Sequence, residues 1–172
     1  GSMKVQERYD AFQREAVINI ITDFKEDSQG RYLLVIPTGG GKTTTAVKAV
    51  SGLYAEGVLQ PDEEILWLVH RDELKTQAFD SFNRFALESN QPWLSSRVHI
   101  VMLGGVKKFL LANPSVRFAV IDEAHHAAAN SYQPLFERPN FGILGLTATP
   151  SRHDAKPLQF SKESYSVGFP DL

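Results

Sequence analysis

Three consecutive glycines stand directly before a lysine and a threonine in the segment Arg31–Thr45, which reads RYLLVIPTGGGKTTT. Because residues 39–41 have no side chains, several of their backbone N–H groups can point at one anion. Lys42 adds a full positive charge, and a helix that begins here adds the partial positive charge of its N-terminus. Thr43 has a hydroxyl that can bind the Mg²⁺ accompanying a nucleotide. The segment predicts a polyphosphate site, and a glycine-rich turn with a surface lysine is the plainer alternative.

Two adjacent carboxylates, Asp122 and Glu123, directly follow the apolar run Phe118–Ile121. A Mg²⁺ ion bound to phosphate oxygens and Thr43 needs another oxygen ligand, usually through water, and Asp122 is placed to supply it. Glu123 can then orient the attacking water or take its proton. Taken alone, the pair could be two solvated acids in a loop. Acids that end a strand downstream of a phosphate loop are, however, what nucleotide hydrolysis requires.

The rest of the chain predicts the elements that must hold these residues. Short apolar runs alternate with segments whose apolar residues recur every three or four positions, the patterns of buried strands and amphipathic helices. The expected strands are Tyr32–Ile36, Ile65–Val69, Val98–Leu103, Phe118–Ile121 and Phe141–Leu146, with a further edge strand at Glu163–Val167. The expected helices are Val5–Phe24, Lys42 to about Tyr54, a third marked by Leu74, Ala78, Phe79, Phe82, Phe85 and Ala86, and Val106–Leu111.

Strands that alternate with helices predict an α/β fold, an open and mostly parallel sheet with helices on both faces. Polar residues follow the carboxyl ends of the strands, where such sheets bind their ligands. A chain of 172 residues is one domain's worth of sequence, so we expect residues 1–172 to form a single domain. We interpret residues 1–3 as a tag remnant and start methionine, and residues 155–172 as an edge strand or the start of a linker.

Composition narrows the class of protein. The formal net charge is −2, so any nucleic-acid partner must be held by a local basic patch and not by the charge of the whole molecule. The absence of cysteine excludes disulfides and thiolate metal sites and is typical of a reducing compartment. No apolar run approaches the length of a membrane span. We therefore expect no membrane partner and an intracellular location, which is the cytoplasm if the source is bacterial.

Several segments together resemble the motifs of superfamily 2 helicases and translocases. Residues 122–125 spell DEAH, and with PTGGGKT at residues 37–43 and TAT at 147–149 they resemble motifs II, I and III. LVHRDELKTQ, ending at Gln77, resembles motif Ia, and Phe12–Gln13 resembles the aromatic-glutamine pair before the phosphate loop. TATPSRHD at 147–154 resembles a form found in motor subunits of restriction enzymes and in excision-repair helicases, which favours DNA over RNA. The matches span nearly the whole of a first RecA-like domain.

The resemblance implies a P-loop NTPase (RecA-like) fold with ATP and Mg²⁺ as cofactors. It implies that Gln13 recognises adenine, with Tyr9 or Phe12 as aromatic support. Nucleotide binding is implied for Thr38, Gly39, Gly40, Gly41, Lys42, Thr43 and Thr44. Catalytic roles are implied for Lys42, Asp122, Glu123 and His125, and metal binding for Thr43 and Asp122. His125 with Thr147 or Thr149 would link the nucleotide site to the nucleic-acid surface.

Three basic residues are candidates for contacts with nucleic-acid phosphates. Arg71 follows an expected strand, and Lys107 and Lys108 begin an expected helix, although an ordinary solvated face is the alternative for the two lysines. The resemblance implies the ATP-binding half of a motor that acts in full length as an ATP-dependent DNA helicase or duplex translocase, and it leaves open whether the pathway is restriction, DNA repair or antiviral defence.

Hydrolysis in this superfamily needs a second RecA-like domain, and few residues follow Asp154. We therefore expect this domain alone to bind nucleotide with little turnover. The alternatives are an RNA helicase or nucleic-acid sensor of the same superfamily, another P-loop nucleotidase or kinase, and a binding module without catalysis.

Overall fold

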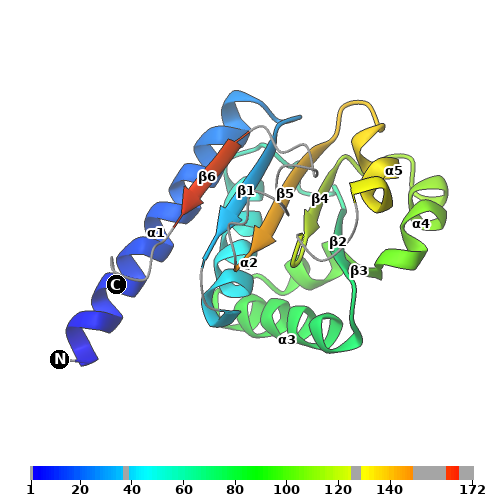
Figure 1. The fold of residues 1–172 in the computed structure, drawn as a ribbon. Coiled ribbons are helices and arrows are strands. Elements are labelled where there is room, and N and C mark those ends of the chain that lie inside the picture. The colour runs from blue at the N-terminus through cyan, green and yellow to red at the C-terminus, as the bar shows by residue number, and fades with distance from the viewer. Residues whose placement is uncertain (1, 37–38, 125–128, 149–161, 167–172) are drawn as a thin grey trace.

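The computed structural model describes residues 2–36, 39–124, 129–148 and 162–166. In these residues, six strands form one sheet in the order β3-β2-β4-β5-β1-β6, and each neighbouring pair is parallel (Figure 1). The strands are β1 (Arg31–Val35), β2 (Ile65–Val69), β3 (Val98–Met102), β4 (Phe118–Ile121), β5 (Gly142–Thr147) and β6 (Lys162–Ser166). The expected α/β fold with a parallel sheet is confirmed.

Helices cover both faces of the sheet. The α-helices are α1 (Ser2–Glu26), α2 (Gly39–Ala55), α3 (Asp72–Glu88), α4 (Val106–Ala112) and α5 (Gln133–Phe136). Short 3₁₀ turns lie at η1 (Pro92–Arg97), η2 (Leu103–Gly105) and η3 (Ala129–Tyr132). One core forms between the sheet and α1, α2 and α3, and the other between the sheet and α4 and α5. In Figure 1, α1 runs beside β6 and β1, and α4 and α5 lie together at the other side.

Successive residues of a strand point to opposite faces, so each buried strand contributes to both cores. In β1, for example, Leu34 joins the core under α1 to α3, whereas Leu33 and Val35 join the core under α4 and α5. This explains why the strands read as unbroken apolar runs and not as alternating patterns.

Several element bounds differ from expectation by one or a few residues, and two short elements were not expected. The edge strand occupies Lys162–Ser166, one residue earlier than expected, and pairs with β1. The first helix begins at Ser2, and the short helix α5 and the turn η1 had no clear periodic signal. Pro92 and Pro134 mark where η1 and α5 begin, because proline favours the first turn of a helix.

The third helix is confirmed, but Phe79 does not belong to its buried stripe. The stripe consists of Leu74, Ala78, Phe82 and Ala86, whereas Phe79 is 58% exposed. The cause is the position of α3 near β3, which forms the edge of the sheet. No further strand of the described residues lies beyond β3 to cover the flank of the helix from which Phe79 projects.

The strand order brings the expected site segments together. β5 lies between β1 and β4, so the segments that follow β1 and β4 leave the same edge of the sheet. Ile36 donates a backbone hydrogen bond to Thr147 after β1. After β4, Asp122 donates to Leu68 of β2 and Ala124 donates to Leu146 of β5. The two segments are thereby tied to a common framework.

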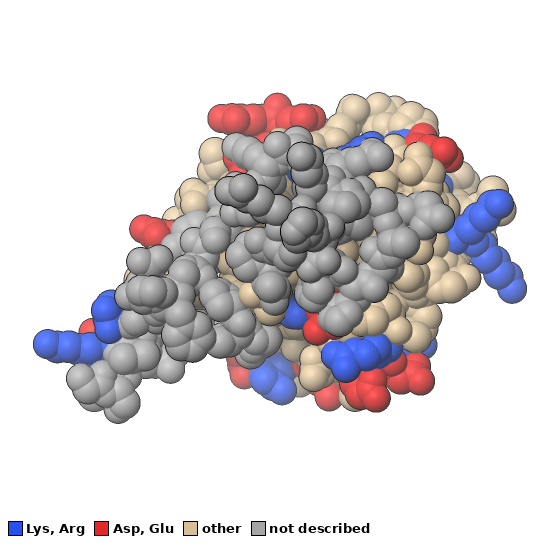
Figure 2. All heavy atoms as spheres, in the orientation of Figure 1, with Lys and Arg blue, Asp and Glu red and all other residues tan. Residues whose placement is uncertain are grey.

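The charged surface has no dominant sign. Figure 2 shows one face in the orientation of Figure 1, with both basic and acidic side chains around its rim. Contacts with a polyanion must therefore come from small groups of residues.

Within the described residues, no helix combines the length and apolar character that crossing a membrane requires.

Candidate active site

The structure places Lys42 beside both acids that follow β4. Its Nζ lies 3.6 Å from Asp122 Oδ1 and 3.4 Å from Glu123 Oε1. The side chains of Lys42 and Asp122 are 5% and 1% exposed, so this contact lies inside the protein. Because ion pairs are less screened away from water, the lysine and the two acids form one electrostatic unit.

The start of α2 positions the lysine. The helix begins at Gly39, directly after the β1 segment, so Lys42 lies in its first turn, where unpaired N–H groups favour an anion. The Thr45 hydroxyl donates a 2.6 Å hydrogen bond to the Gly41 carbonyl and closes this turn. Thr43 is also buried, and its hydroxyl belongs to the same turn as Lys42. The sequence-predicted phosphate-loop residues thus form a helix N-terminus.

The backbone of Glu123 is strained. Its φ is +49°, a left-handed conformation that costs a non-glycine residue about 1–2 kcal/mol. The hydrogen bonds of the neighbouring Asp122 and Ala124 N–H groups to β2 and β5 hold the segment in place. Strain that the surrounding structure maintains in this way is common at functional sites.

Asp122 is an ionisable group in an environment that disfavours its charge. Burial raises the pKa of Asp122 above its ordinary value of 3.8, the Lys42 ammonium opposes this shift, and the Glu123 charge adds to it. Both Asp122 carboxylate oxygens are buried and make no hydrogen bond of ordinary geometry within the part of the chain that the structure describes, although Lys42 Nζ lies 3.6 Å from Oδ1. Buried polar oxygens of this kind call for a partner, and Mg²⁺ prefers carboxylate and hydroxyl oxygens. Asp122 and Thr43 therefore fit a magnesium site.

The Asp122→Asn variant is expected to be more stable than the wild type at neutral pH without nucleotide or Mg²⁺. The gain should be roughly 1 kcal/mol, or about 2–4 °C in Tm for a domain of this size. The raised pKa means that the buried charge costs free energy above the folded-state pKa, and that this cost disappears as the pH falls toward 3.8. The advantage of the variant should shrink on acidification, as thermal unfolding at several pH values would measure.

The exposed Asp62 is the matched control, since Asp62→Asn should leave Tm unchanged at each pH. A lower Tm of Asp122→Asn at neutral pH would contradict the cost assigned to the Asp122 charge.

Two further groups reach Glu123 from the end of β2. His70 Nε2 lies 3.2 Å and an Arg71 Nη2 lies 3.6 Å from Glu123 Oε2. Lys42 approaches the other carboxylate oxygen, so basic groups face Glu123 from two sides. The motif that includes His70 and Arg71 therefore belongs to the same site as the acids.

A cleft of about 420 Å³ opens beside these residues and continues along α3. Among the residues that the structure describes, its lining is polar apart from Leu74 and consists of Lys42, Thr43, Thr44, Arg71, Leu74, Gln77, Asp80, Ser81, Arg84 and Glu123. Sequence reasoning missed Ser81 and Arg84. A signal was present, because polar residues at 77, 81 and 84 recur at helical spacing and so share one face of α3.

Other predicted residues lie elsewhere. The Gln13 side-chain oxygen accepts a 2.7 Å hydrogen bond from Lys48 of α2, and Gln13 is not among the residues that line the cleft. Thr147 is buried at the end of β5, opposite Val35 of β1. Lys107 and Lys108 are exposed on α4, beyond the carboxyl end of β3. Three predicted residues, Thr38, His125 and Thr149, lie outside the described residues.

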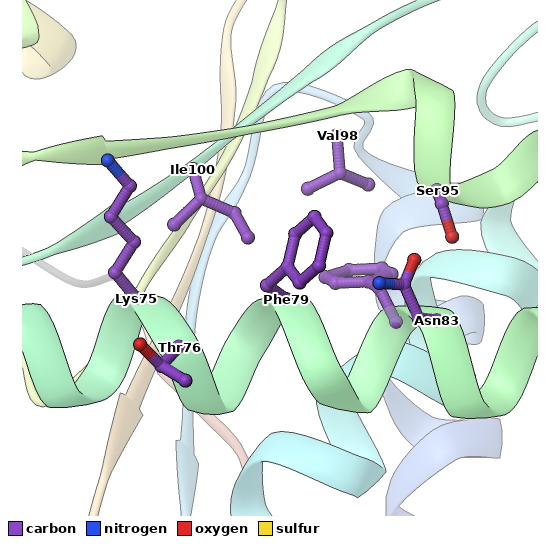
Figure 3. A pocket seen from close by; sticks show the side chains of 8 residues that line it. Lys75, Thr76, Phe79, Asn83, Ser95, Val98 and Ile100 are labelled. Carbon is purple, nitrogen blue, oxygen red and sulfur yellow. The ribbon is translucent and has the colours of Figure 1, made fainter.

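A second cavity of about 380 Å³ lies between α3 and β3 and contains none of the predicted site residues. Figure 3 shows Phe79 projecting from α3 toward Val98 and Ile100 of β3, with Lys75 at one side. This cavity accounts for the exposure of Phe79. Part of its wall is apolar, and neither Lys42 nor Glu123 lines it, so we assign the nucleotide chemistry to the polar cleft.

Residues 7–152 match the protein family described as type III restriction enzyme, res subunit (ResIII). The chain belongs to this family. The ResIII chain is 26% identical over 188 residues to a protein named "Putative helicase 22" of Sulfolobus islandicus filamentous virus, covering 92% of this chain and 32% of the relative. It is 29% identical over 167 residues to "Putative mitochondrial ATP-dependent helicase irc3" of Schizosaccharomyces pombe, covering 86% of this chain and 27% of the relative.

Two solved structures share the fold of the ResIII chain. A nuclease-deletion mutant of the type ISP restriction-modification enzyme LlaGI, in complex with a DNA substrate mimic, matches with a TM-score of 0.69 and 19% identity, over 92% of this chain and 19% of that chain. The UvsW helicase from bacteriophage T4 matches with a TM-score of 0.65 and 18% identity, over 91% of this chain and 59% of that chain.

The ResIII chain spans about a quarter to a third of the length of the curated relatives it matches. Family, relatives and fold confirm the expected first RecA-like domain of a superfamily 2 helicase. They identify an ATP-dependent helicase or translocase motor domain, for which the family implies the use of a nucleotide.

Proposed function

We propose that this ResIII chain is the ATP-binding half of a DNA-dependent ATPase, and that the full-length protein is an ATP-dependent DNA helicase or duplex translocase. The observation that carries the proposal is the buried Lys42 amine, within 3.6 Å of carboxylate oxygens of both Asp122 and Glu123. A cation at a helix N-terminus next to two acids provides the parts that phosphoryl transfer to water needs.

In this proposal each site residue has its own role in ATP hydrolysis. Lys42 leaves the carboxylates for the phosphates of ATP, and the N–H groups at the start of α2 bind the same anion. Thr43 and Asp122 would hold Mg²⁺, which when bound neutralises phosphate charge. Glu123 orients a water and accepts its proton. Roles for Thr38, His125 and Thr149 rest on the motif resemblance alone.

Adenine recognition by Gln13 is also part of the proposal. The hydrogen bond from Lys48 ties Gln13 to α2, the helix whose first turn holds Lys42. When the nucleotide binds, Gln13 would therefore give up its hydrogen bond with Lys48 and bind the adenine base instead. Thr147, at the end of β5, is proposed to link the nucleotide site to the nucleic-acid surface because it lies next to the segments that follow β1 and β4.

DNA is the proposed nucleic acid. Its support is the TATPSRHD segment together with the type ISP restriction-modification enzyme of the same fold, whose structure holds a DNA substrate mimic. Arg71, Lys107 and Lys108 follow β2 and β3 at the carboxyl edge of the sheet and are proposed to contact backbone phosphates. Together with this substrate we propose a role in restriction, repair or antiviral defence and an intracellular location.

The second proposed partner is another RecA-like domain of the full-length protein, since the curated relatives extend well beyond the matched part. Arginine fingers supplied across such an interface raise phosphoryl-transfer rates by about 10³- to 10⁵-fold. We therefore expect the 172-residue chain to bind ATP but to turn it over on the order of 10³-fold more slowly than the full-length protein.

Steady-state ATPase assays on this chain and on the full-length protein, with no nucleic acid, duplex DNA or RNA, test the proposal. The full-length protein should be stimulated by DNA more than by RNA. Greater stimulation by RNA would favour an RNA helicase or sensor, and fast DNA-stimulated turnover by this chain alone would contradict the need for a second domain.

A further inference from the structure

The Glu123 carboxylate is held on both oxygens. Lys42 Nζ lies 3.4 Å from Oε1, whereas His70 Nε2 and Arg71 Nη2 lie 3.2 Å and 3.6 Å from Oε2. The Glu123 side chain is only 16% exposed, and its Oε2 is buried. A water that Glu123 is to activate must reach one of these oxygens, and in this arrangement basic side chains stand at both.

The three basic groups differ in what can draw them away. Lys42 is buried and faces the site where ATP phosphates would bind, so ATP itself can remove it from Oε1. Arg71 is half-exposed at the start of α3, directly after β2, and can reach both Glu123 and a ligand outside the sheet edge. Arg71 therefore joins the interior of the site to the surface at which DNA is proposed to bind.

The contact between Arg71 and Glu123 is suited to exchange. Ion pairs with an exposed partner contribute little free energy, because water and salt screen them. A nucleic-acid phosphate offers a guanidinium a stronger, bidentate partner than a single carboxylate oxygen at 3.6 Å. A strand that arrives at Arg71 can thus compete for it successfully.

We propose that Arg71 is a positioning residue that restrains the Glu123 carboxylate, with His70 beside it, until a nucleic-acid phosphate takes Arg71 away. ATP binding frees Oε1 by removing Lys42, and strand binding removes Arg71 while His70 stays at Oε2, which loosens the carboxylate so that it can turn toward the attacking water. Turnover is therefore faster with both ligands bound than with ATP alone, so the rate of ATP hydrolysis responds to the nucleic acid. This inference rests on the proposed function, because it assigns a means of regulation to that same site.

The test is the Arg71→Ala variant of the full-length protein in ATPase assays with and without duplex DNA. Without DNA, turnover should rise about two- to fivefold, the range that an exposed ion pair can account for. At saturating DNA, kcat should stay near the wild-type value, while the DNA concentration needed for half-maximal stimulation rises. Arg71→Lys keeps the charge, and its turnover rate without DNA should lie between those of the wild type and Arg71→Ala.

Lys75 provides the matched control, because it is basic and exposed and lies one helical turn further along α3, against the second cavity (Figure 3). Lys75→Ala should leave the DNA-independent rate unchanged. If Arg71→Ala destabilises the fold, Arg71→Gln keeps a long polar side chain without the charge and should show the same rise.

The outcomes separate the two proposals. A DNA-independent rate that is unchanged or lower in Arg71→Ala, in a protein whose wild type is stimulated by DNA, would overturn the restraint and leave Arg71 as a strand contact. A wild-type protein without DNA-stimulated ATPase would instead overturn the proposed function. A purely structural role for Arg71 would lower both rates and Tm together, and would not raise the rate without DNA.

Discussion

The Lys42→Ala variant is expected to lose nucleotide-dependent turnover, with kcat/KM lowered on the order of 10²- to 10³-fold or more. Lys42 is the cation that lies against both acids, and it lies in the first turn of α2, whose N-terminus faces the proposed anion site. Its removal takes away the charge that stabilises the transferring phosphoryl group. ATP affinity should fall as well, because the lysine is proposed to contact the bound phosphates.

Two measurements check this expectation: calorimetric titration with ATP and Mg²⁺, and ATPase assays of the full-length protein. The control is Lys25, a surface lysine at the end of α1 whose Nζ lies 3.6 Å from Glu56 Oε1. Lys25→Ala should behave like wild type. Since the substitution removes the cation beside the buried Asp122 and leaves Glu123 with Arg71 and His70, the folded state of Lys42→Ala has to be verified by thermal unfolding. Unaltered ATP binding by the folded variant would exclude the proposed phosphate site.

The Glu123→Gln variant is expected to bind ATP within a few-fold of wild type but to turn it over about 10²- to 10⁴-fold more slowly. Glutamine has nearly the same size and keeps one oxygen, yet it cannot accept a proton from water at neutral pH. Binding and turnover should thus separate in this variant, unlike in Lys42→Ala. Single-turnover assays with preformed protein and ATP would measure the chemical step directly.

Glu88, an exposed acid at the end of α3, serves as the control for this substitution, and Glu88→Gln should keep the wild-type rate. If Glu123→Gln retained full turnover, the catalytic base would have to be sought elsewhere. If it lost ATP affinity to the same degree as Lys42→Ala, the acid would serve binding and not chemistry.

The fold could be predicted from the sequence because parallel strands that are buried on both faces read as unbroken apolar runs. The runs at Ile65–Val69 and Phe118–Ile121 appear in the structure at the predicted bounds. Since all carboxyl ends of a parallel sheet meet at one edge, the proximity of Lys42 to Asp122 could also be anticipated.

Contacts that depend on the order of strands could not be predicted. His70 and Arg71 reach Glu123 because β2 lies next to β4, and no local pattern in either segment specifies which strands are neighbours. The pairing of Gln13 with Lys48 likewise depends on how α1 packs against α2. The exposure of Phe79 follows from the place of β3 at the edge of the sheet, which apolar periodicity does not report.

The hydrogen bonds on either side of Glu123 also have a mechanical consequence. The Asp122 N–H donates to β2 and the Ala124 N–H donates to β5. The segment that carries Glu123 is therefore hydrogen-bonded to two strands that are not neighbours in the sheet. A shear of one strand against the other would turn this peptide and change the direction of the carboxylate. In the proposed motor, load on the domain would therefore act on the angle of the Glu123 carboxylate, and force would slow hydrolysis without displacing either ligand.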